Sequence, residues 1–321
     1  MTSKTVSIVT PCYNEEGSVR ECYEAVKALF DDELRGYRRE HIFCDNASKD
    51  GTAGVLREIA ARDPAIKVIL NSRNFGVFRS MFNGLLAASG DAAVPFLPAD
   101  LQDPPDVIVQ FVRHWEEGYE VVYGQRRNRR EFIGTRLLRN LHYRLVNRLS
   151  AIEIPPDAGE FQLIDRKVIE ALRQFDDHEP YLRGMIAACG FRATGVAYDW
   201  GVRKHGQSKT GIYQMIEITL NGLVSFSNVP VRISLISGFV LSFLSLIYGL
   251  FLLISALVAP ERSPVSGIAT LLVGLFFFGG VQLFFLGVIG EYVTAIHSQV
   301  RTRPLVIERE RINFDADGQE K

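Results

Sequence analysis

Apolar and polar positions in the first hundred residues follow two alternating periods. Short apolar runs rich in β-branched residues predict strands, and they are 5–10, 41–44, 67–71 and 93–97. Between them, apolar residues recur every three or four positions and predict helices, over 18–30, 54–62 and 77–89. Strands that alternate with helices favour a parallel sheet with right-handed crossovers. We therefore expect an α/β fold in this part of the chain.

Acidic residues gather where three of these strands end. The acidic segments are 15–16, 45–50 and 100–106. In parallel sheets ligands collect at the carboxyl ends of the strands, and carboxylates there can hold a divalent cation that binds a phosphorylated substrate. For 45–50 the alternative is a turn of helix-capping side chains. Asp45 directly follows a strand, where it can accept hydrogen bonds from a ribose or a base.

Two long stretches near the end of the chain, 233–260 and 263–290, contain no charged residue. Each is long enough to cross a bilayer as a helix, and a short polar turn joins them. We predict a two-helix transmembrane hairpin with spans of about 233–259 and 265–290. Arg232, Arg301 and Arg303 flank it, so the positive-inside tendency places both flanks in the cytoplasm. The alternative is a buried hairpin in the core of a soluble protein.

The segment 125–150 is strongly basic, with eight arginines and a single acid, Glu131. From residue 135 onward its leucines fall on one helical face, which is typical of a helix lying on a membrane surface. A solvated face is the alternative. A second amphipathic candidate, 211–231, leads into the first apolar run.

Composition narrows the class of protein. The 321 residues are 47% hydrophobic and 23% charged, which excludes a disordered chain, a collagen-like repeat and a disulfide scaffold. The net charge of −1 argues against a nucleic-acid partner. The four cysteines lack zinc-site spacing, so we expect free thiols in a reducing compartment. The sequence has no P-loop and no dinucleotide-binding glycine motif. Its first residues lack the apolar length and the cleavage site of a signal peptide.

A series of motifs resembles the inverting family 2 glycosyltransferases of GT-A fold. In chain order the motifs are VTPCYNEE (9–16), DNASKDGT (45–52), NFGVFRSMFNG (74–84), ADLQDPP (99–105), YGQR (123–126), DAGEFQLIDRK (157–167), RKHGQSK (203–209) and GEYVTAIHSQVRTRP (290–304). With the two apolar runs, the chain is similar to the polyprenyl-phosphate glycosyltransferases, which include dolichyl-phosphate-mannose-synthase-like and bactoprenol glucosyltransferase-like enzymes.

The resemblance implies a plan for the whole chain. A GT-A nucleotide-sugar-binding domain with a mainly parallel sheet is expected over 1–165, and an acceptor-side segment with amphipathic interfacial helices over 166–231. The transmembrane hairpin then occupies 232–298, and a cytoplasmic tail 299–321. The enzyme is expected in the inner (plasma) membrane as a multi-pass protein with its catalytic domain and both termini in the cytoplasm. Glycines in the second span suit helix packing, so a homo-oligomer is also considered.

The implied reaction is inverting transfer of a sugar from a nucleotide-diphosphate sugar to a polyprenyl phosphate, with undecaprenyl phosphate favoured. The lipid-linked product would serve cell-envelope glycan modification, such as that of lipopolysaccharide or O-antigen. The acceptor phosphate is largely dianionic at neutral pH and needs no base. Arginine forks suit such a phosphate. The implied acceptor-phosphate ligands are Arg126, Arg139, Arg203 and Lys209.

The resemblance also assigns the donor side of the site. The implied nucleotide-binding residues are Pro11, Tyr13, Glu15, Asp45 and Asp100. The implied catalytic residues are Asp157, for orientation or electrostatic stabilisation, and Asp100. The implied cofactor is Mg²⁺ or Mn²⁺, with Asp100 and Gln102 as ligands. Pro98 stands where the family usually has the first metal-site carboxylate, so we expect weak metal affinity in the absence of donor.

Two other functions are weighed. A processive polysaccharide synthase of the same fold commonly carries a Gln-x-x-Arg-Trp motif, which this sequence lacks. A non-catalytic, membrane-anchored donor-binding protein is suggested only by Pro98.

Overall fold

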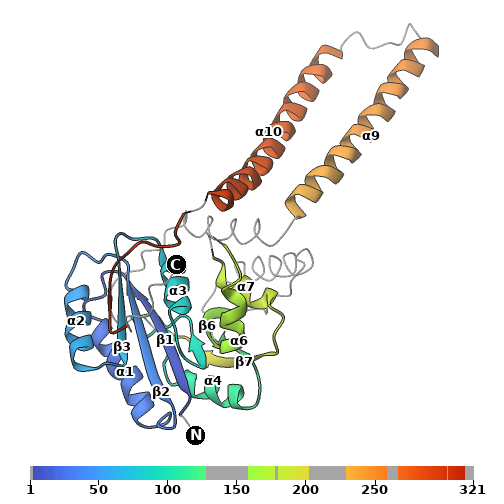
Figure 1. The fold of residues 1–321 in the computed structure, drawn as a ribbon. Helices are drawn as coiled ribbons and strands as arrows, with labels where there is room; N and C mark the ends of the chain where they lie inside the picture. Colours follow the sequence, from blue (N-terminus) through green and yellow to red (C-terminus); the bar gives the residue numbers. More distant parts are fainter. Residues whose placement is uncertain are drawn as a thin grey trace. The chain divides into compact units, whose positions relative to one another are not determined.

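The computed structural model describes residues 3–127, 158–177, 180–201, 229–258, 267–301 and 303–314 (Figure 1). The chain forms two compact units. The first comprises Met1–Tyr143, Ile152–Ile212 and Thr302–Lys321, and the second comprises Arg144–Ala151 and Tyr213–Arg301. The first unit holds a mixed β-sheet with its helices, and the second holds two long helices.

The sheet of the first unit has eight strands among the described residues, in the order β7-β5-β6-β4-β1-β2-β3-β8. Their bounds are β1 Thr5–Cys12, β2 Arg38–Asp45, β3 Ile66–Asn71, β4 Ala92–Val94, β5 Val121–Arg127, β6 Ala158–Asp165, β7 Ala193–Asp199 and β8 Glu308–Ile312. The pairs β4–β1, β1–β2, β2–β3 and β5–β7 are parallel. β6 is antiparallel to both β4 and β5, and β8 is antiparallel to β3. The expected α/β fold with a mostly parallel sheet is confirmed.

Helices cover both faces of this sheet (Figure 1). Their bounds are α1 Val19–Asp31, α2 Thr52–Arg62, α3 Val77–Leu86, α4 Val107–Glu116, α6 Arg166–Leu172 and α7 Leu182–Ala188. α1, α2 and α4 share one core with side chains from one face of the strands, such as Phe43 and Phe161. Phe111 of α4 is fully buried there, and burial of such a side chain is worth about 1.5–3 kcal/mol. This core fixes the strands whose ends carry the acidic loops.

The strands and helices predicted in the first hundred residues are all present, and some of their ends differ from the predicted bounds. The strand predicted over 93–97 is only Ala92–Val94, because Pro95 has no amide to donate to a ladder. The sequence boundary at 165 falls at the end of β6, and the same sheet continues to β7. All four cysteines are free thiols, as expected.

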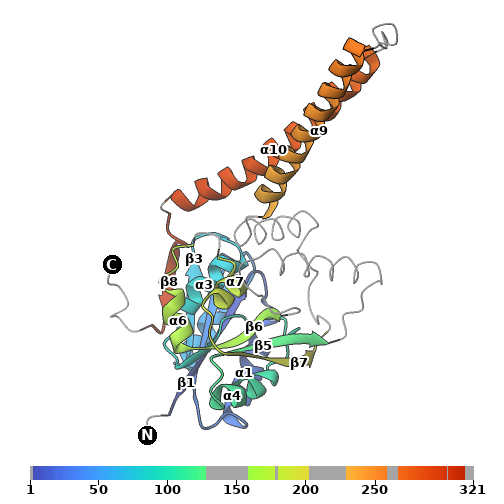
Figure 2. The same cartoon turned by 90° about the vertical axis from the view of Figure 1, so that its right-hand side faces the viewer.

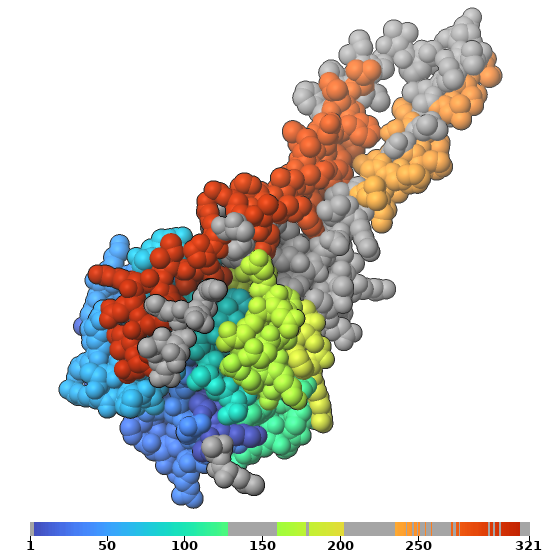
Figure 3. Space-filling model, viewed as in Figure 1, coloured from blue at the N-terminus to red at the C-terminus, as the bar shows by residue number. Residues whose placement is uncertain are grey.

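The segment after the second long helix joins the sheet of the first unit as β8 (Figure 2). Arg57 of α2 pairs with Glu310 of β8 through two contacts of 2.5 and 2.6 Å. Asn313 donates to the carbonyls of Ala60 and Ile66 over 2.7 and 2.9 Å. The predicted cytoplasmic tail, 299–321, therefore contributes an edge strand to the sheet. Figure 3 shows this segment in red on the surface, beside blue residues of the same domain.

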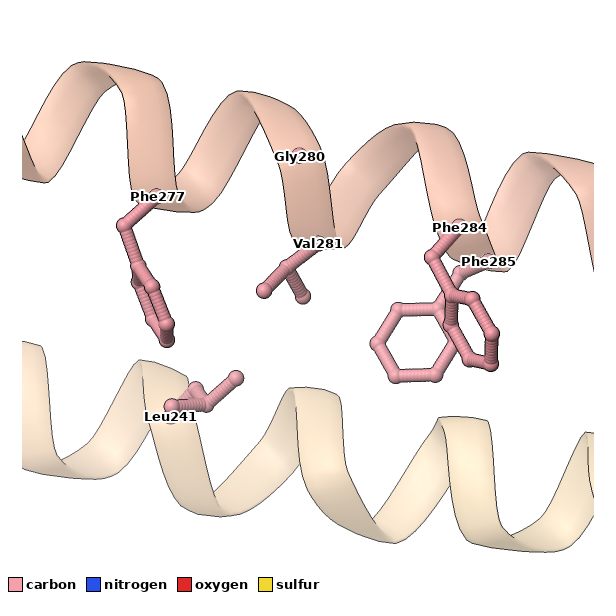
Figure 4. A pocket seen from close by; sticks show the side chains of 6 residues that line it. All are labelled: Leu241, Phe277, Gly280, Val281, Phe284 and Phe285. Atoms are coloured by element: carbon pink, nitrogen blue, oxygen red, sulfur yellow. The ribbon is translucent and has the colours of Figure 1, made fainter.

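The second unit contains α9 (Val229–Val258) and α10 (Gly267–Val300), which contact each other. Within the described residues, one stretch is long and apolar enough to cross a membrane, Phe277–Thr294, and none of it is buried inside the protein. A groove of about 500 Å³ lies between the two helices. Phe277 and Val281 of α10 point into it, and Leu241 of α9 faces them (Figure 4). The expected hairpin of two spans stays a prediction.

Candidate active site

The loops that follow β1, β2 and β4 meet at one edge of the sheet. In the parallel register Cys12 lies opposite Asp45, and Ile8 lies opposite Val94. The amide of Leu97, after β4, then donates to the carbonyl of Val9 over 2.9 Å. The three acidic segments therefore lie at the same carboxyl edge, as the sequence predicts.

Hydrogen bonds tie the loop after β1 to the loop after β2. The amide of Asn14 donates to the Ser48 hydroxyl over 2.9 Å, and the Lys49 amide donates to the Asn14 side chain over 2.7 Å. Asn14 has a φ of 54°, a left-handed conformation that asparagine tolerates better than most residues. The amide of Glu15 donates to the Thr52 hydroxyl over 3.0 Å. These contacts fix the backbone at Glu15 and beside Tyr13, two of the expected nucleotide-binding residues.

Asp45 ends β2 with a buried carboxylate. It accepts the Ser48 amide over 3.1 Å and also the Ser48 hydroxyl. Burial raises the pKa of Asp45, the hydrogen bonds from Ser48 oppose that shift, and the charge of Asp50 adds to it. The turn that the sequence offered as the alternative is thus present. A carboxylate has about four lone-pair sites, so Asp45 keeps accepting capacity for a ribose or a base.

A buried amide network that the sequence analysis missed joins this edge to the start of α3. The Asn71 side chain donates to the Asn46 side chain over 2.9 Å and to the Ser80 hydroxyl over 3.2 Å. The Asn46 side chain donates in turn to the carbonyl of Gly76 over 3.2 Å. Gly76 has a φ of 90°, which suits glycine alone. The network positions the loop between β3 and α3 beside Asp45.

The loop after β4 holds the expected metal ligands in a tight turn. Oδ1 of Asp100 accepts the amide of Gln102 over 3.2 Å, and Leu101 between them has a φ of 55°. The carbonyl of Gln102 accepts the Gly201 amide over 2.9 Å. The turn therefore holds the carboxylate of Asp100 against the backbone of Gln102, and the Gln102 carbonyl anchors the turn to the segment after β7.

These donors fit a hard divalent cation that takes further ligands from its substrate. Carboxylate and amide oxygens are the ligands that Mg²⁺ and Mn²⁺ prefer. The described part of the chain contains no group of three or more His, Cys, Asp or Glu side chains that could hold a metal by themselves. The carboxylate of Asp103, the next acid along the loop, forms an ion pair with Arg126. Water or a bound substrate would have to complete the coordination sphere.

Arg126, an expected acceptor-phosphate ligand on β5, is held by two partners. Its Nη2 lies 3.0 Å from Oδ2 of Asp103, and its Nε lies 3.3 Å from Oδ1. Nε also donates to the Tyr198 hydroxyl over 3.1 Å, and that hydroxyl donates to Asp103. Burial lowers the pKa of Arg126, but Asp103 and Tyr198 outweigh it and the net shift is upward. The guanidinium is charged, oriented and half-buried at the edge of the sheet.

The aromatic partners of Arg126 come from a part of the sequence that contains none of the predicted motifs. Tyr198 and Trp200 lie at and after the end of β7, and the guanidinium of Arg126 lies 4.8 Å from the Trp200 ring centroid. The Tyr198 ring crosses Gly124, where an added Cβ would come within 2.6 Å of it. The glycine in the YGQR motif therefore admits the ring that positions Arg126.

The structure brings six of the expected site residues to this edge: Tyr13, Glu15, Asp100 and Gln102 follow parallel strands, Asp45 ends β2, and Pro11 is the second-last residue of β1. Pro11 itself lies buried within β1 opposite Cys44. Arg126 reaches the loop after β4 through Asp103. The remaining expected residues lie outside the described residues: Arg139, Asp157, Arg203 and Lys209.

Comparison with known proteins gives matches over part or nearly all of the chain. Residues 7–173 match the family model for Glycosyl transferase family 2. The chain is 36% identical to Uncharacterized glycosyltransferase YkcC of Bacillus subtilis over 302 residues, which is 94% of this chain and 92% of that protein. It is 34% identical to the bactoprenol glucosyl transferase of Shigella phage SfII over 305 residues, which is 94% of this chain and 96% of that protein.

Among solved structures, the chain is similar to the mannosyltransferase PcManGT from Pyrobaculum calidifontis in complex with GDP-Man and Mn²⁺. The identity is 21% and the TM-score is 0.46. The match covers 70% of this chain and 63% of that one, so this chain spans less than two thirds of the mannosyltransferase.

Proposed function

The chain belongs to glycosyl transferase family 2 and is a glycosyltransferase, and from this premise we propose that it transfers a sugar from a nucleotide-diphosphate sugar to a polyprenyl phosphate. One observation carries the proposal. The similarity to bactoprenol glucosyl transferases extends over 94% of the chain, well beyond the 7–173 domain and through both long helices. Those names imply a lipid acceptor, and an enzyme with such an acceptor must work at a membrane. This chain has a helix apolar enough to cross a membrane.

The donor occupies the carboxyl edge in this proposal. Asp45 and the loop after β1 contact the nucleoside, and the diphosphate lies next to Asp100 and Gln102. A bound Mg²⁺ or Mn²⁺ supplies Lewis-acid stabilisation of the leaving nucleoside diphosphate. Asp100 would be a ligand of that cation. Because its turn with Gln102 already fixes the carboxylate, little reorganisation would be needed during the reaction.

The acceptor needs cationic ligands and no general base. A phosphate monoester with a second pKa near 6 is largely dianionic at neutral pH, so it attacks the anomeric carbon directly. Attack from the face opposite the leaving group inverts that carbon in a single displacement. Arg126 uses Nε and Nη2 on Asp103 and keeps further N–H groups for a phosphate oxygen. Arg139, Arg203 and Lys209 are proposed to supply the remaining charge, and Asp157 to orient the reacting groups.

Membrane attachment is the third part of the proposal. Phe277–Thr294 of α10 spans the bilayer, and α9 forms the second span of a hairpin whose two flanks lie in the cytoplasm. Large apolar side chains of both helices are exposed, among them Phe239 and Phe284 at 74% and 67%. Hydrocarbon is the solvent that makes such exposure favourable. The proposed location is the plasma membrane of a bacterium, with undecaprenyl phosphate as the acceptor and envelope glycan modification as the process served.

A donor screen with lipid extraction tests the proposal. Purified full-length protein is incubated with Mn²⁺, undecaprenyl phosphate and a panel of radiolabelled nucleotide sugars. The proposal predicts label in the organic phase with at least one donor, and only when the lipid phosphate is present. Ethanol-insoluble polymer in place of lipid would identify a processive synthase, and no transfer from any donor would favour the non-catalytic alternative.

A further inference from the structure

The start of β8 and the end of β3 form one corner of the sheet domain. Asn71, the last residue of β3, lies opposite Glu308, and the amide of Ser72 donates to the carbonyl of Ile307 over 2.9 Å. Two segments therefore meet at the carboxyl edge, 72–77 before α3 and 303–307 before β8. We call them together the β3–β8 corner.

The β3–β8 corner exposes apolar and basic side chains and contains no acid. Val77 is 42% exposed and Ile307 is 53% exposed, although both are large aliphatic residues. Arg73 and Arg303 are exposed as well. The guanidinium of Arg73 lies 4.0 Å from the ring centroid of Phe75. Neither SRNFGV (72–77) nor RPLVI (303–307) includes an aspartate or glutamate.

Hydrogen bonds from the domain interior hold the loop of this corner. The Asn74 side chain accepts the amide of Gly76 over 2.9 Å, and the buried Asn46 side chain donates to the Gly76 carbonyl over 3.2 Å. On the other segment Val306 is only 9% exposed and anchors the chain beside Ile307. The exposed side chains therefore project from a preorganised backbone, which lowers the entropic cost of binding a surface.

Chain connectivity limits how far this corner can be from the end of α10. α10 ends at Val300, and Ile307 is bonded to the end of β3, so seven residues join the two points. Seven residues extend at most about 25 Å. If α10 crosses a bilayer, as in the proposed function, the β3–β8 corner lies within about 25 Å of the end of that helix, and so within reach of the lipid headgroups.

We propose that the β3–β8 corner is a membrane-contact surface for anionic lipid, with Val77 and Ile307 seated among the headgroups and Arg73 and Arg303 paired with lipid phosphates. The inference rests on the proposed membrane attachment. Apolar side chains interleaved with arginines are the composition that binds an anionic interface. Contact here turns the carboxyl edge, and with it Asp45 and Asp100, toward the leaflet that holds the acceptor phosphate.

Fluorescent labels at single cysteines test this contact. The full chain carries Cys189→Ser, which leaves only the buried thiols of Cys12, Cys22 and Cys44, and then receives Val77→Cys or Ile307→Cys. Glu33→Cys, exposed at the opposite edge before β2, is the solvent control, and Phe284→Cys in α10 is the bilayer control. Each variant is labelled with a nitrobenzoxadiazole fluorophore. It is then reconstituted into vesicles of phosphatidylcholine and phosphatidylglycerol and exposed to nitroxide-bearing lipid or to iodide.

The labels at positions 77 and 307 are expected to lose fluorescence to the nitroxide lipid and to resist iodide, whereas the label at 33 does the reverse. Adding Arg73→Gln and Arg303→Gln should reduce the nitroxide quenching at 77 to the level seen in pure phosphatidylcholine vesicles. Labels at 77 and 307 that follow the solvent control while 284 is quenched would overturn this inference alone. If 284 also resists the nitroxide lipid, the membrane span itself is refuted.

Discussion

Arg126 and Asp103 form an ion pair in which both carboxylate oxygens face the guanidinium, at 3.0 and 3.3 Å. Asp103 is almost fully buried, with 1% of its side chain exposed, and Arg126 retains 20%. The pair joins the loop after β4, which carries Asp100, to β5. Arg126, which we propose binds the acceptor phosphate, is therefore also part of the frame of the site.

Replacing Asp103 with asparagine is expected to destabilise the sheet domain by about 3 kcal/mol, because the Arg126 charge is left half-buried without its counter-charge. The free energy of unfolding can be measured by urea titration of the detergent-solubilised protein. Both tryptophans, Trp115 and Trp200, lie in the described part of the sheet domain and report on it. Asp106→Asn, three residues on and exposed, is the matched control and should change stability by less than about 0.5 kcal/mol. Equal effects of the two variants would contradict this account.

Gly124→Ala is expected to cost about 1–3 kcal/mol and to lower turnover. The added methyl would lie 2.6 Å from the Tyr198 ring and 3.0 Å from the carbonyl of Phe161, so the ring must move away from Asp103. Gly54→Ala in α2 meets nothing within 4 Å and should instead stabilise by about 0.5–1 kcal/mol. Urea titration and transfer rates measured on both variants check the contrast. Wild-type stability and turnover in Gly124→Ala would show that Tyr198 does not need this glycine.

Glu40 lies at the amino edge of the sheet, away from the site. Its surroundings predict that the stability of the sheet domain depends on pH. Its carboxylate accepts from Lys67 over 2.7 Å and from the Ser89 amide and hydroxyl over 2.8 and 2.6 Å. Burial alone would raise the pKa of Glu40, but these bonds and one from Ser7 outweigh it and lower the pKa. The stabilisation of the fold by the Glu40 carboxylate is therefore complete above the pKa of about 4.3 in the unfolded chain. It is lost as the pH falls through the lower pKa of the folded protein.

The measurement for Glu40 is the melting temperature of wild type and Glu40→Gln between pH 7 and pH 3. The wild type should be more stable at pH 7, and the difference should shrink as the pH falls. Sugar transfer at pH 7 and permissive temperature should be the same in both proteins, since Glu40 lies at the far end of the strands. A difference in melting temperature that persists unchanged to pH 3 would refute the assigned cause.

Much of the fold was predictable because its signals are local. Apolar positions 19, 22, 26, 29 and 30 are all buried in α1, as their helical spacing requires. Parallel pairing followed from strand–helix alternation, and it placed Asp45 and Asp100 at the same edge. The edge strand β8 was not predictable, since ERERI has the composition of a solvated tail and is held by contacts such as Arg57–Glu310, 253 residues apart in sequence.

The site was predictable where a motif is contiguous and was missed where it is assembled from distant strands. Asp100 and Gln102 stand in one short loop, so their turn follows from the sequence. Tyr198 is 95 residues from Asp103, and nothing in YDW (198–200) indicates an arginine partner. Asn46 and Asn71 carry no charge and no catalytic signature, yet their buried amides join two loops of the site.

Metal binding should depend on the donor. With Asp100 and Gln102 as its protein ligands, the site should bind Mn²⁺ weakly alone and much more tightly when a nucleoside diphosphate supplies phosphate oxygens. Calorimetric titration of Mn²⁺ into the protein, with and without the nucleotide product of the active donor, measures both affinities. Tight binding of Mn²⁺ in the absence of nucleotide would mean that further protein ligands exist.

The most direct test of the central claim is transfer of radiolabelled sugar to undecaprenyl phosphate by the purified wild type and by Asp100→Ala. Asp106→Ala, an exposed acid in the same loop, is the matched control. The account predicts organic-extractable label with wild type and Asp106→Ala, dependent on the lipid phosphate and on Mn²⁺, and loss of that label with Asp100→Ala. Full transfer by folded Asp100→Ala, or no lipid-linked sugar from the wild type with any donor, would contradict it.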